Sequence, residues 1–343
     1  MTKVVRTPMA ATREALLNAK AKALVRSRWG DVADRAEAGG FPVGAALAAD
    51  GTAWVLAEED AARSLGGALV WALRRDAATV HLFVNSTDDA GALARRAQHF
   101  ATDITVWQVD GTALRKAAPA DLEPDPALDE RAEPFVALFE RAGATTVAEG
   151  GILRAEVRGL EVARVELDPT TNEPRLAIGV GKHDREAQRE VRGDRQGFDE
   201  LFDVVRIVAE HRVAEGAGHA AFHLSAERWL RDVVIRNPGL VGAAPGLTAV
   251  ASPARRDDLR APASAPAAGV DADGGGPLLV VCSVGTDLDL VPAATDAYAA
   301  DGRDPDLRFV VPEGDDHPAT RDLVDALRMP AGLTTVPPDW RAR

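Results

Sequence analysis

The segment from residue 145 to residue 192 carries the residue types that chemistry on a phosphate ester requires. Glu149 and Glu161 are twelve residues apart, Lys182 follows in a Gly-Val-Gly-Lys sequence, and Gln188 comes six residues later. Carboxylates are hard oxygen ligands that suit Mg²⁺, and an ammonium group can activate water and offset the charge that develops on a phosphate. These side chains are therefore the first candidates for a functional site.

The order of these residues resembles the core of the PD-(D/E)XK, or restriction-endonuclease-like, nucleases over residues 131–192. In that family an acid on one strand and an acid-x-lysine on the next hold a divalent metal ion and a water, and a glutamine on the following helix often supports the site. The resemblance implies a metal-dependent, nuclease-like phosphodiesterase that uses Mg²⁺ or Mn²⁺. Glu149 and Glu161 would be the metal ligands, and the catalytic set would be Glu149, Glu161, Lys182 and Gln188.

The motif departs from the family at the lysine position after Glu161, which is Ala163, so Lys182 would have to reach the site from the neighbouring strand. Ala163 and the net acidity of the chain favour a second interpretation, a non-catalytic ligand- or partner-binding protein with a regulatory or scaffold role. The concentration of acids beside a single lysine favours the enzyme, and both functions stay open. A shared site without metal predicts a raised pKa for one of the two carboxyls, because like charges repel.

A second candidate site follows the apolar strand predicted over residues 278–284. Gly285, Asp287 and Asp289 lie in the turn between that strand and a predicted helix. In open parallel sheets, ligands bind at the carboxyl ends of the strands. The two aspartates could hold a metal ion or a ribose hydroxyl, and Gly285 would let the backbone approach a cofactor closely. The alternative is a strand-to-helix turn in which an aspartate is the helix N-cap.

Three regions of the chain must position these residues, and the first is an α/β domain over residues 1–116. A helix is predicted over residues 10–38, and Asp50-Gly51 is typical of a hairpin between two apolar strands. Elements then alternate with short loops: a helix at about 60–75, the strand Val80–Val84, a helix at about 88–100 that Ser86-Thr87-Asp88 caps, and the strand Ile104–Val109. This β-α-β-α-β order predicts parallel strands with helices packed across them.

The middle region, residues 131–250, is predicted to be a mixed α+β domain. Its patterns indicate a helix at 131–142, strands at 152–157, 160–167 and 176–180, and helices at 183–192, 197–215 and 221–236. Glu149 thus precedes a hairpin, Glu161 lies on its second arm, and Lys182 follows the third strand.

Residues 251–277 are rich in Ala, Pro, Gly and Asp, and we expect a flexible linker there because their apolar content cannot offset the entropy of ordering. Residues 278–343 show a second β-α-β-α-β pattern, without repeating the sequence of the first. The predicted fold class is therefore α/β, with a parallel β-α-β-α-β N-terminal unit, a mixed middle region and a C-terminal β-α-β-α-β unit. The C-terminal strands could also join one of the earlier sheets.

Composition limits the partners of the chain. Its 343 residues include 53 acids and 40 bases, and the net charge of −13 disfavours bulk, non-specific nucleic-acid binding and an anionic membrane surface. Five bases are lysines and the other 35 are arginines, as is typical of GC-rich, actinobacterial-type genomes, so an arginine cluster does not by itself indicate a site. The single Cys282 and the lack of signal-peptide and membrane-spanning patterns predict a cytoplasmic protein. The oligomeric state stays open.

Overall fold

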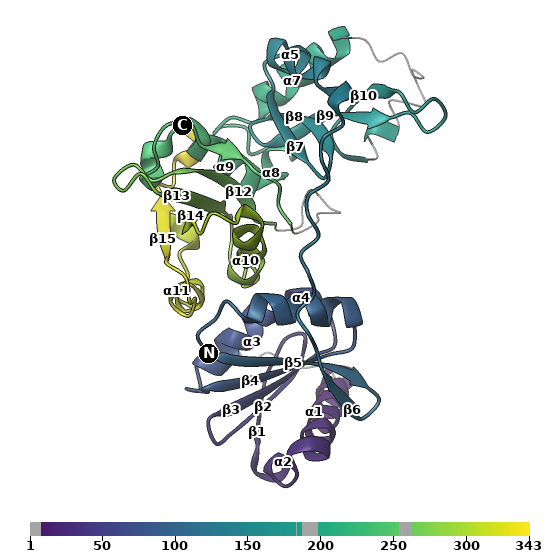
Figure 1. The fold of residues 1–343 in the computed structure, drawn as a ribbon, viewed down its shortest axis with the longest axis vertical. Coiled ribbons are helices and arrows are strands. Elements are labelled where there is room, and N and C mark those ends of the chain that lie inside the picture. The colour runs from purple at the N-terminus through teal and green to yellow at the C-terminus, as the bar shows by residue number, and fades with distance from the viewer. Residues whose placement is uncertain (1–7, 183, 187–197, 254–258, 260–262) are drawn as a thin grey trace. The chain divides into compact units, whose positions relative to one another are not determined.

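The computed structural model describes residues 8–182, 184–186, 198–253, 259 and 263–343. These residues form a mixed α/β protein with three β-sheets (Figure 1). The chain divides into two compact units. The first comprises residues 1–122, 288–295 and 317–330, and the second comprises residues 123–287, 296–316 and 331–343.

The first unit contains a six-stranded sheet with the order β1-β2-β3-β4-β5-β6. The three strands β3, β4 and β5 run parallel, while β1, β2 and β6 pair antiparallel with their neighbours. The strands are β1 (Glu37–Gly39), β2 (Gly44–Ala49), β3 (Thr52–Ala57), β4 (Thr79–Val84), β5 (Asp103–Asp110) and β6 (Ala113–Lys116). The helices of residues 8–122 are α1 (Pro8–Trp29), α2 (Val32–Arg35), α3 (Ser64–Leu73) and α4 (Thr87–Ala97).

Several local predictions for this sheet are confirmed. Asp50 and Gly51 form the turn between β2 and β3 with positive φ angles of 50° and 72°, as an Asp-Gly hairpin requires. Strands β4 and β5 are parallel neighbours, and Phe83 is fully buried. Helix α4 begins after Ser86, whose side chain accepts a hydrogen bond from the Asp89 N–H.

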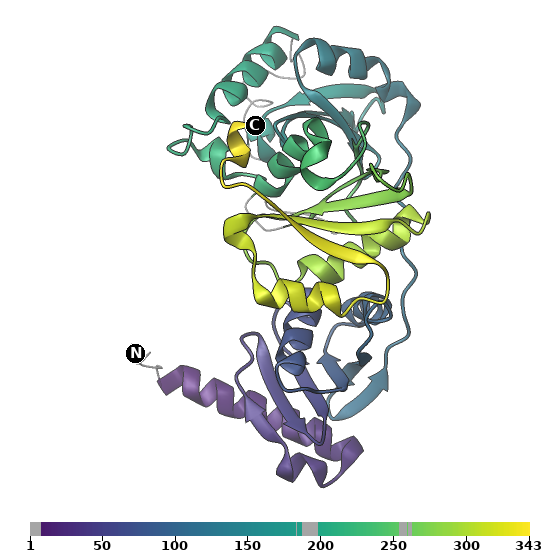
Figure 2. The same ribbon diagram turned by 90° about the vertical axis from the view of Figure 1, so that its left-hand side faces the viewer.

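The single helix predicted over residues 10–38 is wrong beyond Trp29, because a break separates the short helix α2 from α1 and residues 37–39 form a strand. Helix α1 ends at Trp29, and Gly30 adopts a φ of 66°, the left-handed conformation that commonly terminates a helix. Residues 37–39 form β1, which pairs with β2. Helix α1 packs on β2, β3 and β6 (Figure 2), where a cluster of aromatic rings surrounds His81.

The middle of the chain forms an antiparallel sheet with the order β10-β9-β8-β7. Its strands are β7 (Thr145–Glu149), β8 (Ile152–Val157), β9 (Leu160–Leu167) and β10 (Pro174–Ile178). Its apolar face packs in one core with α5 (Pro134–Arg141) and α7 (Phe198–His211). The helix predicted over residues 221–236 is two helices, α8 (Ala220–His223) and α9 (Ala226–Arg236), because Ser225 adopts a φ of 46° between them. Most of the helix predicted at 183–192 lies outside the described residues.

The third sheet has the order β11-β12-β13-β14-β15. Its strands are β11 (Thr248–Ala249), β12 (Ala265–Val270), β13 (Pro277–Cys282), β14 (Asp306–Pro312) and β15 (Ala331–Val336), and α10 (Leu290–Asp301) and α11 (Pro318–Asp325) are the intervening helices. The flexible linker predicted for residues 251–277 is therefore wrong for residues 265–270, which form an internal strand. Ala265 and Ala267 are buried there, and Ala265 belongs to the same hydrophobic core as Trp229 of α9.

The third sheet repeats the topology of strands β1–β5 of the first sheet. In each, the first two strand pairings along the sheet are antiparallel and the next two are parallel, and the first sheet has β6 as an additional antiparallel strand. The C-terminal strands thus join neither of the other sheets but pair with β11 and β12. None of the helices in the described part of the chain has the length and apolar content needed to cross a bilayer.

Candidate functional site

The antiparallel sheet has one apolar face and one charged face. Side chains alternate along a strand, so Ala155 on β8 enters the core while Arg154 and Glu156 lie on the opposite face. Arg154 lies directly opposite Arg164 of β9, and a register shift between Ala155 and Glu156 places Glu156 directly opposite Glu161. Two pairs of like charges therefore face each other across β8 and β9.

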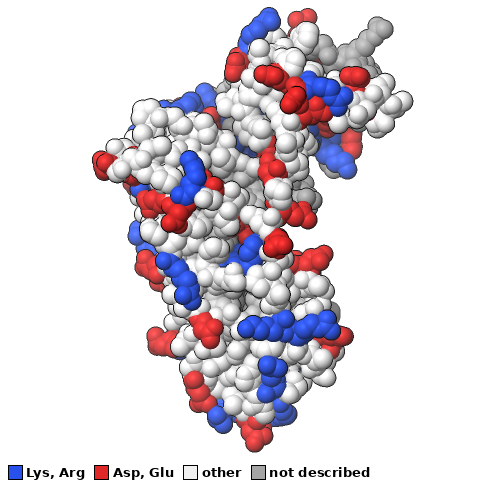
Figure 3. Space-filling view, in the orientation of Figure 1, with Lys and Arg blue, Asp and Glu red and all other residues white. Residues whose placement is uncertain are grey.

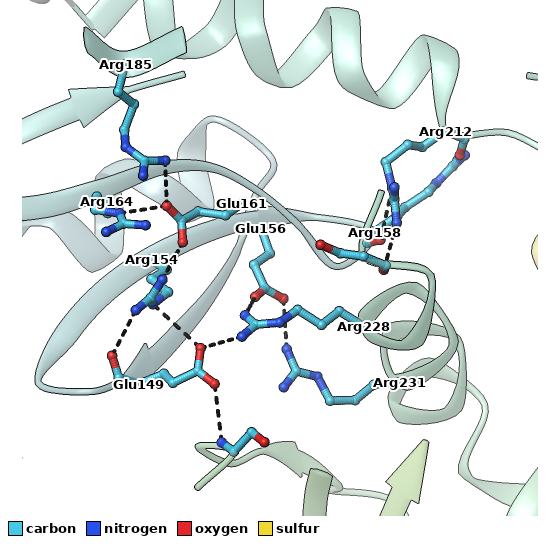
Figure 4. Close-up of polar contacts among 12 residues, drawn as sticks. Glu149, Arg154, Glu156, Arg158, Glu161, Arg164, Arg185, Arg212, Arg228 and Arg231 are labelled. Atoms are coloured by element: carbon cyan, nitrogen blue, oxygen red, sulfur yellow. Dashed lines mark hydrogen bonds and ion pairs between the residues drawn. The ribbon is translucent and has the colours of Figure 1, made fainter. Parts of the chain in front are cut away.

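Glu161 accepts hydrogen bonds from three guanidinium groups (Figure 4). Arg154 Nη1 lies 2.5 Å from Oε2, and Arg164 Nε and Arg185 Nη1 lie 2.7 Å and 2.9 Å from Oε1. The side chains of Glu161 and Arg185 are 7% and 8% exposed. One carboxylate that is largely removed from water is therefore the shared ion-pair partner of three cations.

Two further glutamates are held by arginines of α9. Arg228 donates from Nη2 to Glu149 Oε2 at 2.5 Å and from Nη1 to Glu156 Oε1 at 2.6 Å, and Arg231 Nη2 donates to Glu156 Oε2 at 2.9 Å. Arg154 links this group to Glu161, because its Nε also lies 3.7 Å from Glu149 Oε2. We define the arginine–glutamate cluster as Glu149, Arg154, Glu156, Glu161, Arg164, Arg185, Arg228 and Arg231.

The arginines keep both predicted metal ligands ionised. Burial by itself would raise the pKa of Glu149, but Arg228 and Arg154 hold it below its ordinary value. Burial would likewise raise the pKa of Glu161, but the three guanidinium groups around it lower it. The expectation of a raised carboxyl pKa is therefore wrong, because the nearest charges are guanidinium groups rather than a second carboxylate.

Arg228 and Arg185 are unequally compensated. Burial would lower the pKa of Arg228, but Glu156 and Glu149 together raise it above its ordinary value. Burial also lowers the pKa of Arg185, and Glu161, which Arg185 shares with two other arginines, does not restore it. The two glutamates therefore outweigh burial at Arg228, whereas burial outweighs Glu161 at Arg185.

The turn between β8 and β9 contacts α9 directly. Arg158 has a φ of 47°, and its carbonyl accepts hydrogen bonds from Nε and Nη2 of Arg212 at 3.1 Å and 2.8 Å. Arg212 is fully buried and stacks on the ring of Trp229, with Cζ 4.5 Å from the ring centroid. A Cβ atom at Gly159 would overlap the backbone of Arg228. These contacts set the distance between the charged face of the sheet and the arginines of α9.

A cavity of about 470 Å³ lies at the Glu161 end of the cluster. Small-molecule sites typically have volumes of about 300–1,000 Å³, so this volume suits a small ligand. Among the described residues, the charged side chains that line the cavity are Arg154, Arg164, Lys182, Arg185 and Arg228 on the basic side and Glu161, Glu166 and Glu186 on the acidic side.

The carboxylate oxygens that would bind a metal ion are engaged by other groups. Both oxygens of Glu161 accept from guanidinium groups, while Glu149 accepts from Arg228 with one oxygen and from the Ser252 N–H, at 3.2 Å, with the other. A divalent cation here would lie beside positively charged guanidinium groups, which would repel it. In the described part of the chain, no group of three or more His, Cys, Asp or Glu residues is arranged to hold a metal ion.

The structure brings some of the predicted catalytic residues together. Glu161 and Lys182 line the same cavity, whereas Glu149 is not among its described lining residues. Lys182 is 79% exposed, and its Nζ lies 3.8 Å from Glu186. Gln188 lies outside the described residues. The group that contacts both Glu149 and Glu161 is the guanidinium of Arg154.

The predicted cofactor residues have other partners. The Gly285 N–H donates to Asp315 Oδ2 at 2.7 Å, and Gly285 adopts a φ of 81°. Asp289 is buried and forms ion pairs at 3.7 Å with Arg63 and Arg96, within the first unit. Asp287 is half-buried and belongs to the second unit. Of the two aspartates predicted for a cofactor site, Asp289 therefore has arginine neighbours.

Sequence reasoning missed the arginines that dominate this site. Their abundance in the whole chain concealed them, but two local signals were present. Strict alternation over residues 152–157 puts Arg154 and Glu156 on one face of a strand, and the spacing of Arg228 and Arg231 puts both on one face of a helix.

Comparisons of the chain with protein-family models, with curated proteins and with solved structures returned no match.

Proposed function

We propose that the second unit is a non-catalytic ligand-binding module that takes a small anion in the cavity beside Glu161. The observation that carries this proposal is the sharing of one buried carboxylate by Arg154, Arg164 and Arg185. A buried cation is costly unless it is paired, so a cluster with more guanidinium than carboxylate groups attracts a further anion.

The distribution of charge supports a small ligand rather than a polynucleotide. The chain carries a net charge of −13, which opposes long-range attraction of a phosphate backbone. On the face drawn in Figure 3, the acidic and basic side chains of the described residues are interspersed, and neither sign forms a continuous surface. The basic side chains of the cluster are instead gathered around a cavity of limited volume.

Calorimetric titration tests the proposal. We expect citrate, sulfate and phosphate, each at constant ionic strength, to bind the full-length protein with one site. The Glu161→Gln variant removes the carboxylate that competes for the three arginines, so it should bind these anions more tightly than the wild type, provided that it remains folded by circular dichroism. If none of the anions binds the wild type at millimolar concentration, the proposal is wrong.

A metal-dependent phosphodiesterase is the second candidate, and the placement of Glu161 and Lys182 on one cavity favours it. The phosphodiesterase predicts that Glu161→Gln weakens ligand binding, whereas the anion-binding module predicts that the same variant strengthens it. Mg²⁺ or Mn²⁺ should then raise the melting temperature of the wild type, by mass action, and Glu161→Gln should abolish that rise. A metal-dependent rise that disappears in Glu161→Gln would replace the anion-binding proposal with the enzyme.

A further inference from the structure

The arginine–glutamate cluster carries two more positive than negative charges. Its five arginines face three glutamates, and the ion pairs among them account for every member. The described lining of the cavity shares Arg154, Arg164, Arg185, Arg228 and Glu161 with the cluster and adds Lys182, Glu166 and Glu186, of which Lys182 and Glu186 pair with each other. Glu166, one of those acids, is also engaged by Arg175 on the neighbouring strand. A ligand that neutralises the site would therefore carry about two negative charges.

The excess is concentrated at Arg164 and Arg185. Arg164 donates from Nε to Glu161, and its two terminal nitrogens donate no hydrogen bond to any described residue. Arg185 is 8% exposed, and the acceptors of its Nη1 are Glu161 and the Gly179 carbonyl. Within the described residues, donors of both guanidinium groups remain for an anion in the cavity, where the planar fork of arginine can hold two oxygens at once.

We propose that this cavity binds a small phosphomonoester through its phosphate dianion, with Arg164 and Arg185 as the recognising residues. This inference rests on the anion-binding function proposed above. A phosphomonoester carries a charge of about −1.5 to −2 at pH 7 and presents three terminal oxygens to donors. It therefore matches both the charge excess and the number of guanidinium groups at the Glu161 end of the cluster.

Other anions fit less well. A phosphodiester carries one negative charge and has two terminal oxygens, so it would leave half of the excess uncompensated. A dicarboxylate such as succinate carries two charges, but they are distributed over two separate groups, whereas Arg164 and Arg185 converge on the one carboxylate of Glu161. The size of the cavity allows the organic part of a small metabolite to enter with the phosphate.

The test is calorimetric titration of the full-length protein at pH 7.5 and constant ionic strength with four probes. These are glycerol 3-phosphate, inorganic phosphate, dimethyl phosphate and succinate. We expect glycerol 3-phosphate to bind most tightly and inorganic phosphate to follow. Dimethyl phosphate and succinate should bind at least about tenfold more weakly than glycerol 3-phosphate, as the loss of one charge-assisted hydrogen bond predicts.

Matched variants locate the site. Arg164→Gln should weaken glycerol 3-phosphate binding by about 10- to 100-fold, and Arg164→Lys, which keeps the charge but not the fork, should lie between that variant and the wild type. Arg206→Gln is the control, because Arg206 lies on α7 of the same unit, and neither it nor its ion-pair partners Asp203 and Glu210 line the cavity. The control should bind as the wild type does.

The outcomes separate this inference from the function on which it rests. If succinate or dimethyl phosphate binds as tightly as glycerol 3-phosphate, the module binds anions but the phosphomonoester assignment is wrong. If inorganic phosphate binds and glycerol 3-phosphate does not, the ligand is free phosphate and the assignment is again wrong. If Arg164→Gln binds as the wild type does, the site lies elsewhere. If no probe binds, both proposals are overturned.

Discussion

Arg154 and Arg164 lie directly opposite each other on β8 and β9, and both donate a hydrogen bond to Glu161. Like charges in directly opposite positions normally destabilise a sheet. Here the carboxylate of Glu161 lies between the two guanidinium groups and allows both to be held at the edge of one cavity. Glu161 is therefore a structural counter-ion for the two arginines.

The first prediction concerns that counter-ion. Glu161→Gln should lower the free energy of unfolding by about 3–5 kcal/mol, because it leaves the buried Arg185 and the partly buried Arg154 and Arg164 without their shared carboxylate. Urea denaturation at pH 7 measures the loss. The control is Glu186→Gln, whose side chain is 48% exposed, and it should change the free energy by less than about 0.5 kcal/mol. Equal effects of the two variants would contradict the structural role of Glu161.

The second prediction concerns the contact between the hairpin turn and α9. Gly159 and Gly150 have similar positive φ angles, 76° and 63°, so alanine is strained at both positions. A Cβ atom at Gly159 would also overlap the backbone of Arg228, whereas one at Gly150 would meet nothing within 4 Å. Gly159→Ala should therefore be less stable than Gly150→Ala by about 1–3 kcal/mol in urea denaturation. Equal stability would show that α9 does not pack on this turn.

The third prediction concerns acid sensitivity at His81. Burial among the rings of Trp29, Trp54 and Trp107 lowers the pKa of His81 from 6.5 to about 4. Asp103 has a smaller effect that raises this pKa, and Arg28 has a smaller effect that lowers it. The unfolded chain binds a proton below pH 6.5 and the folded protein does not until about pH 4. Stability should therefore fall as the pH falls through this window.

The full shift corresponds to about 3 kcal/mol, and partial solvent exposure of His81 reduces the expected loss to about 1–2 kcal/mol. Urea denaturation at pH 7 and pH 5 measures it, and in His81→Phe the difference between the two pH values should be smaller than in the wild type. An unchanged difference would place the acid-sensitive group elsewhere.

Below pH 4.5 a separate loss of stability should begin. Glu149 and Glu161 have lowered pKa values, so the stability that their ionised carboxylates contribute disappears as they are protonated.

The fourth prediction concerns the C-terminal residues. Trp340 is 1% exposed, and its ring meets that of Trp229 edge-on, with centroids 5.8 Å apart. Trp340→Ala should lower the free energy of unfolding by about 3–5 kcal/mol, as expected for truncation of a large buried side chain. Arg343→Ala, at an exposed position three residues later, should have an effect within about 0.5 kcal/mol. Similar denaturation midpoints for the two variants would show that residue 340 does not belong to the core.

Local patterns in the sequence determined much of the first and third sheets. Asp50-Gly51, the apolar strand around Phe83 and the cap at Ser86 each depend on neighbours in the chain, and each was predicted correctly. Strand β12 was missed because its alanines have little apolar area of their own. They are buried in the tertiary structure, where Ala265 belongs to the same hydrophobic core as the distant Trp229.

The candidate site likewise has features that local sequence determined and features that only the tertiary structure decided. The sequence by itself determined that Glu149, Glu161 and Lys182 occur near a hairpin, and alternation along β8 determined which of its side chains share a face. Only the tertiary structure decided their partners, because Arg185 and Arg228 come from segments that follow the hairpin and reach the glutamates through packing. The sign of a carboxyl pKa shift depends on the nearest charges, and long-range contacts bring arginines to these glutamates.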